Sequence, residues 1–248
     1  MQLSRRARAS MFVRSFAIQG SWNYRTLIGN GFAFTIVPAL REIFRRRPEE
    51  YRAAVERHTT VFNSHPYLAG IALGAVARLE ADGAEPAVIE RFKTAVRGSL
   101  GSLGDRLIWA GWRPVCVLLA LILLAAGTPW WVPIATFLVI YNAGHIAIRL
   151  WGFRFGLRHG LRVGEELRRY SMGALQRGIA STGAFLLGFL LPLAAAGAIL
   201  ETRLPLGFSL AAVAAAALGL RLGASVRSAV ALALAGFALL GLVHEAVG

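Results

Sequence analysis

One stretch of the chain places a carboxylate among glycines, arginines and tryptophans, directly before a long apolar run. Residues 97–114 read RGSLGSLGDRLIWAGWRP and contain Asp105 and Arg113. A charged side chain at the start of an apolar segment is costly unless it is paired or faces water. Asp105 is therefore a candidate for binding or gating, and an ion pair with Arg113 would act as a structural gate. The alternative is a glycine-rich helix start at the membrane surface, where Asp105 caps the helix or pairs with a neighbouring arginine.

The segment FNSHP at residues 62–66 contributes two further polar candidates, Asn63 and His65. Amide and carboxylate groups suit sugar hydroxyls or a coupling partner, so Asn63 and Asp105 are the leading candidates for a polar binding site. Asn63 is equally compatible with an Asx-turn before the proline. His65 is more typical of a turn or an interface, with a pH-dependent role as the alternative.

Trp22 and Asn23, within QGSWNY at residues 19–24, are candidates for lining a site or contacting a partner. The alternative is that they anchor an amphipathic hairpin at the membrane surface, because tryptophan and tyrosine gather at membrane interfaces. The sequence leaves both interpretations open.

The sequence contains no pattern typical of covalent catalysis or metal binding. None of the five histidines has an evident base, metal partner or phosphate-binding loop, and Cys116 is the single cysteine. We therefore expect no catalytic residue, no metal, no cofactor and no disulfide in this chain.

The composition is that of an all-α integral membrane protein. Hydrophobic residues make up 56% of the 248 positions, above the ~45–50% typical of soluble domains. The formal net charge of +14 is compatible with nucleic acid or with an anionic membrane surface. Because the arginines cluster at the ends of apolar runs, we expect membrane lipid and exclude nucleic acid as a partner.

Residues 1–113 form an amphipathic and re-entrant helical region, within what we expect to be one domain overall. Its apolar runs at 29–40 and 68–79 are shorter than the ~20 residues of a membrane span. Such runs are typically buried, interfacial or re-entrant. The other elements expected here are a charged helix over 41–57 that breaks before Pro48, a turn over 80–86 and an amphipathic helix over 88–97.

Residues 114–248 form the transmembrane helical region. A basic loop with six arginines, 149–169, separates the first two spans from the rest. Because basic loops stay in the cytoplasm, this loop and the N-terminus are expected inside and the C-terminus outside. The expected spans are 115–126, 132–148, 179–200, 206–220 and 229–247, with a turn over 127–131 and a second basic connection over 221–227.

Four segments, in order along the chain, resemble motifs of a known family: the IID membrane subunit of mannose-type (mannose, fructose or sorbose) sugar phosphotransferase systems. The motifs are an early QxxWNY, an FNTxP, a glycine-rich segment with aspartate, tryptophan and Arg-Pro, and a later arginine–glycine segment. The matching residues are Gln19, Trp22, Asn23 and Tyr24; Phe62, Asn63 and Pro66; Gly98, Leu100, Gly104, Asp105, Trp109, Arg113 and Pro114; and Arg149, Gly152 and Gly156.

The glycine-rich motif departs from the family pattern at three positions. Ser99 stands where the family has proline, Ser102 where it has glycine, and Arg106 where it usually has a small residue. His145 stands where a second arginine is common. These departures motivate an alternative to the family function: a structural or regulatory membrane partner that has lost sugar transport.

The resemblance implies that this chain pairs with a IIC subunit in a hetero-oligomer of the cytoplasmic (inner) membrane. The pair would admit a hexose, and IIB would phosphorylate it with a phosphoryl group that comes from phosphoenolpyruvate through IIA. IID carries no phosphohistidine in the family, so the transferase activity would belong to the complex. Arg154, Arg158 and Arg162 would dock IIB, or would only fix the topology against anionic lipid.

Overall fold

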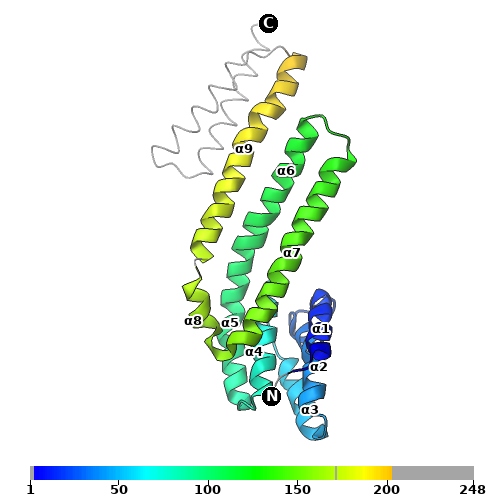
Figure 1. Ribbon diagram of the computed structural model, residues 1–248, viewed down its shortest axis with the longest axis vertical. Helices are drawn as coiled ribbons and strands as arrows, with labels where there is room; N and C mark the ends of the chain where they lie inside the picture. Colours follow the sequence, from blue (N-terminus) through cyan, green and yellow to red (C-terminus); the bar gives the residue numbers. More distant parts are fainter. Residues whose placement is uncertain (1–2, 171, 203–248) are drawn as a thin grey trace. The chain divides into compact units, whose positions relative to one another are not determined.

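The computed structural model describes residues 3–170 and 172–202, which are helical apart from turns and short connections (Figure 1). Within these residues no strand forms, and isolated bridges join Leu27 to Asn23 and to Phe62. The all-α prediction is therefore confirmed. The elements are α1 (Arg5–Arg14), η1 (Ser15–Ala17), α2 (Gly29–Ile43), α3 (Pro48–His58), α4 (Ala69–Ala81), α5 (Pro86–Gly104), η2 (Asp105–Trp112), α6 (Arg113–Ala125), α7 (Trp131–His159), η3 (Gly160–Arg162), α8 (Val163–Arg169) and α9 (Met172–Thr202).

The chain packs as two units. The first contains Met1–Arg113 together with Val139–Ile179, and the second contains Pro114–Leu138 and Ala180–Gly248. Residues 139–179 thus pack with the N-terminal helices, and the division at residue 113 stays a prediction. The spans expected over 206–220 and 229–247, the basic connection 221–227 and the C-terminus lie outside the described residues.

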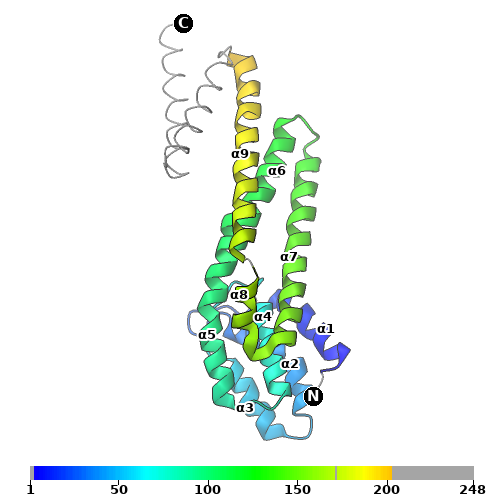
Figure 2. The ribbon, with the colours of Figure 1, turned by 60° about the vertical axis from the view of Figure 1, so that its left-hand side comes forward.

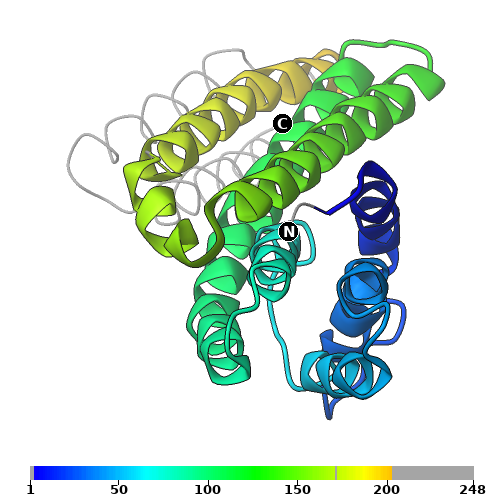
Figure 3. The ribbon, with the colours of Figure 1, turned by 60° about the horizontal axis from the view of Figure 1, so that its bottom comes forward.

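Helix α2 lies at the centre of the N-terminal helices. It contacts α1, α3 and α4, and Figure 3 shows the blue helices α1 to α3 side by side. Its side chains Phe32, Ile36 and Leu40 follow helical spacing and are fully buried, each stabilising the fold by about 1.5–3 kcal/mol. The short apolar run at 29–40 is therefore part of a packed core.

The charged segment breaks where the sequence predicts. Helix α2 ends at Ile43, and α3 begins at Pro48, where a missing backbone N–H costs nothing. Arg52 pairs with Glu49 at 3.1 Å on the exposed face of α3. An exposed pair of this kind contributes at most about 1 kcal/mol.

Helix α4 ends later than expected, which corrects the turn predicted over 80–86. The helix continues to Ala81, so Glu80 is a buried helical residue. Arg57 and His58 both contact its carboxylate, and these contacts stabilise the last helical turn. The chain then reverses at Gly83, whose φ is 73°.

The glycine-rich stretch does not interrupt the helix that enters it. Residues Pro86–Ala125 form one helical run (Figures 1 and 2), in which α5 passes through π-helical η2 into α6. The amphipathic helix expected over 88–97 is therefore longer than predicted. An interior glycine costs about 1 kcal/mol relative to alanine, and packing of this face against residues 62–67 offsets that cost.

The basic segment 149–169, expected as a loop, is helical. Helix α7 continues through it to His159, and η3 and α8 complete it. A methyl group at Gly156 would lie 2.0 Å from the carbonyl oxygen of Ile71. Glycine therefore permits α7 to pack closely against α4, and this contact extends the helix past its apolar run.

Within the residues that the structure describes, three helical runs are long and apolar enough to cross a membrane: Pro86–Ala125, Trp131–Arg169 and Met172–Leu191. The turn predicted over 127–131 joins α6 to α7, with Gly127 at a φ of 75°. Trp130 is 74% exposed and Trp131 57% exposed, as suits anchors at a membrane interface.

Candidate functional site

Residues 62–67 form the junction at which the sequence motifs meet, and the first contact is with the WNY segment. The Phe62 N–H donates to the Thr26 carbonyl (3.2 Å), and the Ile28 N–H donates to the Phe62 carbonyl (3.1 Å). The Phe62 ring is fully buried against Phe32, at 4.7 Å between ring centroids. Backbone pairing and a buried aromatic contact therefore fix the start of the junction.

Asn23 shapes the turn that leads into this pairing. Its Oδ1 accepts hydrogen bonds from the backbone N–H groups of Arg25 (3.0 Å) and Thr26 (2.9 Å), which is an Asx-turn. Trp22 and Tyr24 flank it with exposed rings whose centroids lie 4.8 Å apart. Asn23 is thus committed to local structure, whereas the two aromatic rings are available to lipid or a partner.

Asn63 differs from Asn23 in its surroundings. Its side chain is exposed, and the described residues give it no hydrogen-bond partner. The Asx-turn that the sequence allowed at Asn63 is therefore absent there. Its amide remains free to bind a ligand or a partner chain.

His65 brings the FNSHP segment against the glycine-rich helix. A methyl group at Gly104 would lie 2.2 Å from the His65 Cβ, so no larger residue fits there without a shift. The His65 ring also meets the Trp109 ring, edge to face, at 5.3 Å between centroids. The second and third motifs are therefore packed directly together.

The imidazole of His65 is buried and neutral at physiological pH. Its Nδ1 accepts from the Tyr67 N–H at 3.2 Å, and its Nε2 is buried without a partner among the described residues. Burial lowers the pKa of His65 to about 4, against a smaller opposing effect of the Asp105 charge.

Arg149 connects the fourth motif to the same junction. Its guanidinium is buried; Nη1 donates to the Ser15 carbonyl (2.6 Å) and Nε donates to His145 Nε2 (2.7 Å). It also lies over the Tyr67 ring at 4.9 Å, a cation–π contact. In the described part of the chain no carboxylate pairs with it, so neutral acceptors and aromatic faces hold this charge.

Tyr67 joins the junction to two further side chains of α7, His145 and Tyr141. Its ring stacks on His145 at 4.0 Å between centroids, and its hydroxyl forms a 2.8 Å hydrogen bond with Tyr141. Sequence reasoning did not select Tyr67, Tyr141 or Arg149 as site residues. The available signal was position, since Tyr67 directly follows FNSHP and Arg149 opens the fourth motif.

Asp105 and Arg113 do not form the ion pair considered from the sequence. Both side chains are exposed, and no salt bridge joins them in the described residues. They lie at the two ends of the π-helical segment, Asp105 as its first residue and Arg113 directly after Trp112. π-Helical turns occur frequently at functional sites, so the local geometry keeps Asp105 a candidate for binding, without a gate.

Comparison with known proteins identifies the family. The family described as the PTS system mannose/fructose/sorbose family IID component matches residues 2–211. This chain belongs to that family. The resemblance expected from the four motifs is therefore confirmed.

Individual relatives of this IID chain agree with the assignment. The mannose-specific EIID component of Escherichia coli K12 is 30% identical over 185 residues, covering 73% of this chain and 65% of the relative. The sorbose-specific EIID component of Klebsiella pneumoniae is 29% identical over 186 residues, covering 73% and 67%. This chain thus spans about 65% of the length of the first relative.

Two solved structures are similar to the IID chain. One, described as the structure of a membrane protein, has a TM-score of 0.69 and 28% identity, covering 77% of this chain and 71% of the other. The second is the mannose transporter ManYZ in complex with microcin E492, with a TM-score of 0.60 and 25% identity, covering 100% and 98%.

The three arginines selected as docking candidates remain available to a partner. Arg154 and Arg158 lie on α7 and Arg162 in η3, and all three are exposed. None of them forms an ion pair within residues 3–170 and 172–202. Their charge is therefore not compensated by an ion pair among the described residues.

A second buried polar cluster, absent from the sequence predictions, joins α3 to α4. Glu80 Oε1 lies 2.7 Å from Arg57 Nη2 and 2.8 Å from His58 Nε2. Burial opposes ionisation of Glu80, but the hydrogen bonds from His58 and Arg57 outweigh it and hold the Glu80 pKa below its usual value. Burial lowers the pKa of His58. The cluster therefore ties α3 to α4.

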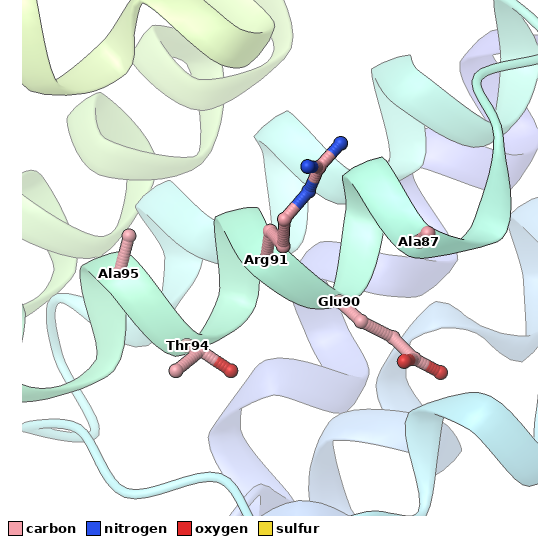
Figure 4. Close-up of a pocket in the computed structure, with 5 residues that line it drawn as sticks. All are labelled: Ala87, Glu90, Arg91, Thr94 and Ala95. Atoms are coloured by element: carbon pink, nitrogen blue, oxygen red, sulfur yellow. The ribbon is translucent and has the colours of Figure 1, made fainter.

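Two further observations bear on the site. The described residues contain no group of three or more His, Cys, Asp or Glu side chains that could hold a metal. The pocket in Figure 4 is lined by Ala87, Glu90, Arg91, Thr94 and Ala95 of α5 alone. Because one helix supplies all five residues, this pocket is a surface feature of α5 and lies apart from the motif junction.

Proposed function

We propose that this chain is the IID half of a sugar-translocating membrane unit that pairs with a IIC subunit. The observation that carries this proposal is the junction at residues 62–67, where segments from all four IID motifs pack together. A fixed junction, in a chain whose described residues include three apolar helical runs, suits a subunit that positions membrane elements for a partner. The ManYZ neighbour, which is named as a mannose transporter, supports the same function.

In this proposal the side chains left exposed around the junction act on the partner or the sugar. Asn63, Asp105 and Trp109 are exposed. Asn63 lies two residues before the packed His65, and Asp105 and Trp109 lie one and five residues after the packed Gly104. Amide, carboxylate and aromatic groups are those that bind sugars. The buried residues then orient this surface and do not contact the sugar.

Phosphoryl transfer belongs to the assembled complex. Phosphorylated IIB, supplied through IIA from phosphoenolpyruvate, would donate to a hexose held by IIC and IID, and the sugar phosphate would remain in the cytoplasm. We place the N-terminus and the arginines of 149–169 on the cytoplasmic side of the inner membrane and the C-terminus outside. The positive-inside distribution of the arginines supports this orientation.

Co-purification with IIC tests the pairing. Tagged IIC from the same genome should retain this chain through extraction in mild detergent and size-exclusion chromatography, and Asn63→Ala or Trp109→Ala should weaken retention if these residues face IIC. Retention of all variants together with loss of labelled-sugar binding would assign them to the sugar instead. Failure of the wild-type chain to co-purify would contradict the pairing.

A further inference from the structure

A second pocket of the first packing unit gathers arginines from three elements. It lies between the α5–η2 helix and the segment from α8 to the start of α9. No acidic residue is among those that line it. The lining residues that matter for its chemistry are Ser99, Ser102, Arg106, Leu167, Arg168 and Arg177.

The three arginines of this pocket are exposed and lack partners within the described part of the chain. Their neighbour Arg169 shows the contrast, because it pairs with Glu165 at 2.8 Å and with Glu166 at 3.0 Å. Both carboxylates of α8 are thereby used by Arg169. The charges of Arg106, Arg168 and Arg177 therefore stay uncompensated at one place.

Close packing holds the elements of this pocket together. A methyl group at Gly111 would lie 2.9 Å from the Ile179 Cγ2, so the start of α9 packs against η2. A methyl group at Gly173 would lie 3.5 Å from the Arg177 Nη1, which places that guanidinium along the first turn of α9. The arginines thus belong to a packed corner, where several donors can meet one anion.

The remaining lining residues indicate the kind of anion. Leu100, Leu103 and Leu167 also line the pocket, and they form an apolar wall beside the guanidinium groups. The lining includes no carboxylate or side-chain amide, and its side-chain hydroxyls are those of Ser99, Ser102 and Tyr170. A ligand with a phosphate and an adjoining apolar chain fits this combination better than a sugar phosphate.

Part of the lining of the pocket comes from the glycine-rich motif. Ser99, Ser102 and Arg106 are the three positions at which this motif departs from the family pattern, and all three line the pocket. The departures therefore lie together on one surface of the long helix. Arg106 adds a charge there in place of a small residue.

We propose that this pocket binds the phosphate of an anionic phospholipid through Arg106, Arg168 and Arg177. Guanidinium groups bind phosphate through paired, charge-assisted hydrogen bonds, and all three arginines lie in or directly beside helical runs apolar enough to span a membrane. The acyl chains would continue along the leucine wall. This inference is independent of the sugar and of IIC.

Native mass spectrometry of the detergent-solubilised full chain tests the proposal. The chain is titrated with equal amounts of phosphatidylglycerol and phosphatidylcholine, and separately with inorganic phosphate and mannose 6-phosphate. The variant Arg106→Gln/Arg177→Gln removes two pocket charges. The control Arg46→Gln/Arg91→Gln removes two charges from exposed arginines elsewhere, of which Arg91 is shown in Figure 4.

The wild-type chain and the control should retain phosphatidylglycerol over phosphatidylcholine, and the pocket variant should bind it about tenfold more weakly. Arg106→Lys/Arg177→Lys should lie between them, because it keeps the charge and loses the planar fork. Equal binding by the pocket variant and the control would overturn the proposal. Displacement of the lipid by millimolar mannose 6-phosphate would also overturn it, by making a soluble phosphate ester the occupant.

Discussion

Gly104 and Gly98 lie on the same helix and face different surroundings. A methyl group at Gly104 would lie 2.2 Å from the His65 Cβ, whereas one at Gly98 would meet nothing within 4 Å. Both glycines belong to the same sequence motif, so the motif alone gives them equal weight. In the structure, close packing against His65 requires glycine at position 104, whereas position 98 is exposed and has room for a side chain.

Replacing these two glycines by alanine should have opposite effects on stability. Gly104→Ala should destabilise the chain by about 1–3 kcal/mol through overpacking against His65. Gly98→Ala should be neutral or stabilising by up to about 1 kcal/mol, since alanine favours helix. Thermal unfolding of both variants in the same detergent checks this. Equal melting temperatures would contradict the close contact.

His65 makes the stability of the junction depend on pH. Its pKa is about 4 in the folded chain and about 6.5 when unfolded, so between these values the unfolded chain binds the extra proton. Stability should therefore fall as pH decreases from about 6.5 to 4, by up to about 3 kcal/mol from His65. His58, whose pKa is also lowered by burial, acts in the same direction.

Melting temperatures measured from pH 7 to pH 4 test this dependence. His65→Gln should reduce the slope in that window to the part that His58 contributes, and His159→Gln, which lies outside the junction, should keep the wild-type slope. Glu80 should add a loss of stability at lower pH, as pH falls through its lowered pKa. A flat wild-type curve would show that His65 is not buried in the folded chain.

At the scale of elements, Arg149 ties α7 to η1 and to the segment after FNSHP. Arg149→Lys keeps the charge but loses the planar fork that reaches both Ser15 and His145. We expect destabilisation by about 1–3 kcal/mol and faster hydrogen exchange at residues 15–17. The control Arg154→Lys, exposed on the same helix, should change stability by less than about 0.5 kcal/mol. If hydrogen exchange at residues 15–17 is unchanged in Arg149→Lys as well as in the control, Arg149 does not hold α7 to η1.

The sequence predicted helix positions better than helix ends. Apolar runs located α2, α4, α6 and α7, and proline located the start of α3. It missed the helical continuation through the glycine-rich stretch and through 149–169, because long-range contacts such as Gly104 with His65 and Gly156 with Ile71 stabilise those turns. Local propensity contains no information about such contacts.

The candidate site was predictable only in part, for the same reason. Asn63, His65 and Asp105 were selected as candidates because they are polar residues close to apolar runs, and their functional role stays a prediction. Arg149 and Tyr67 were not, because their role comes from packing between segments that are far apart in sequence, as in the contact of Arg149 with the Tyr67 ring. The pairing of Asp105 with Arg113 was a reasonable expectation from proximity, and the π-helical segment between them leaves both exposed.

At the scale of the whole molecule, we expect the exposed arginines of α7 and η3, which form no ion pair among the described residues, to bind a phosphorylated partner. Reversal of Arg154, Arg158 and Arg162 to glutamate should weaken binding of phosphorylated IIB by about tenfold or more at low salt, and the loss should shrink as salt increases. Surface plasmon resonance with the IIC–IID complex in nanodiscs measures the affinity of phosphorylated IIB for the wild-type and charge-reversed chains. Unchanged binding would leave these arginines with a role in topology alone.

The most direct test of the proposed function is phosphoryl transfer in membrane vesicles that contain this chain and the IIC subunit proposed as its partner. Purified phosphorylated IIB is added with labelled mannose, fructose, N-acetylgalactosamine or sorbose. The account predicts that one of these sugars becomes phosphorylated, and that the product is lost when this chain is omitted. A stable IIC complex that phosphorylates none of the four sugars would contradict transport and favour a structural or regulatory membrane partner.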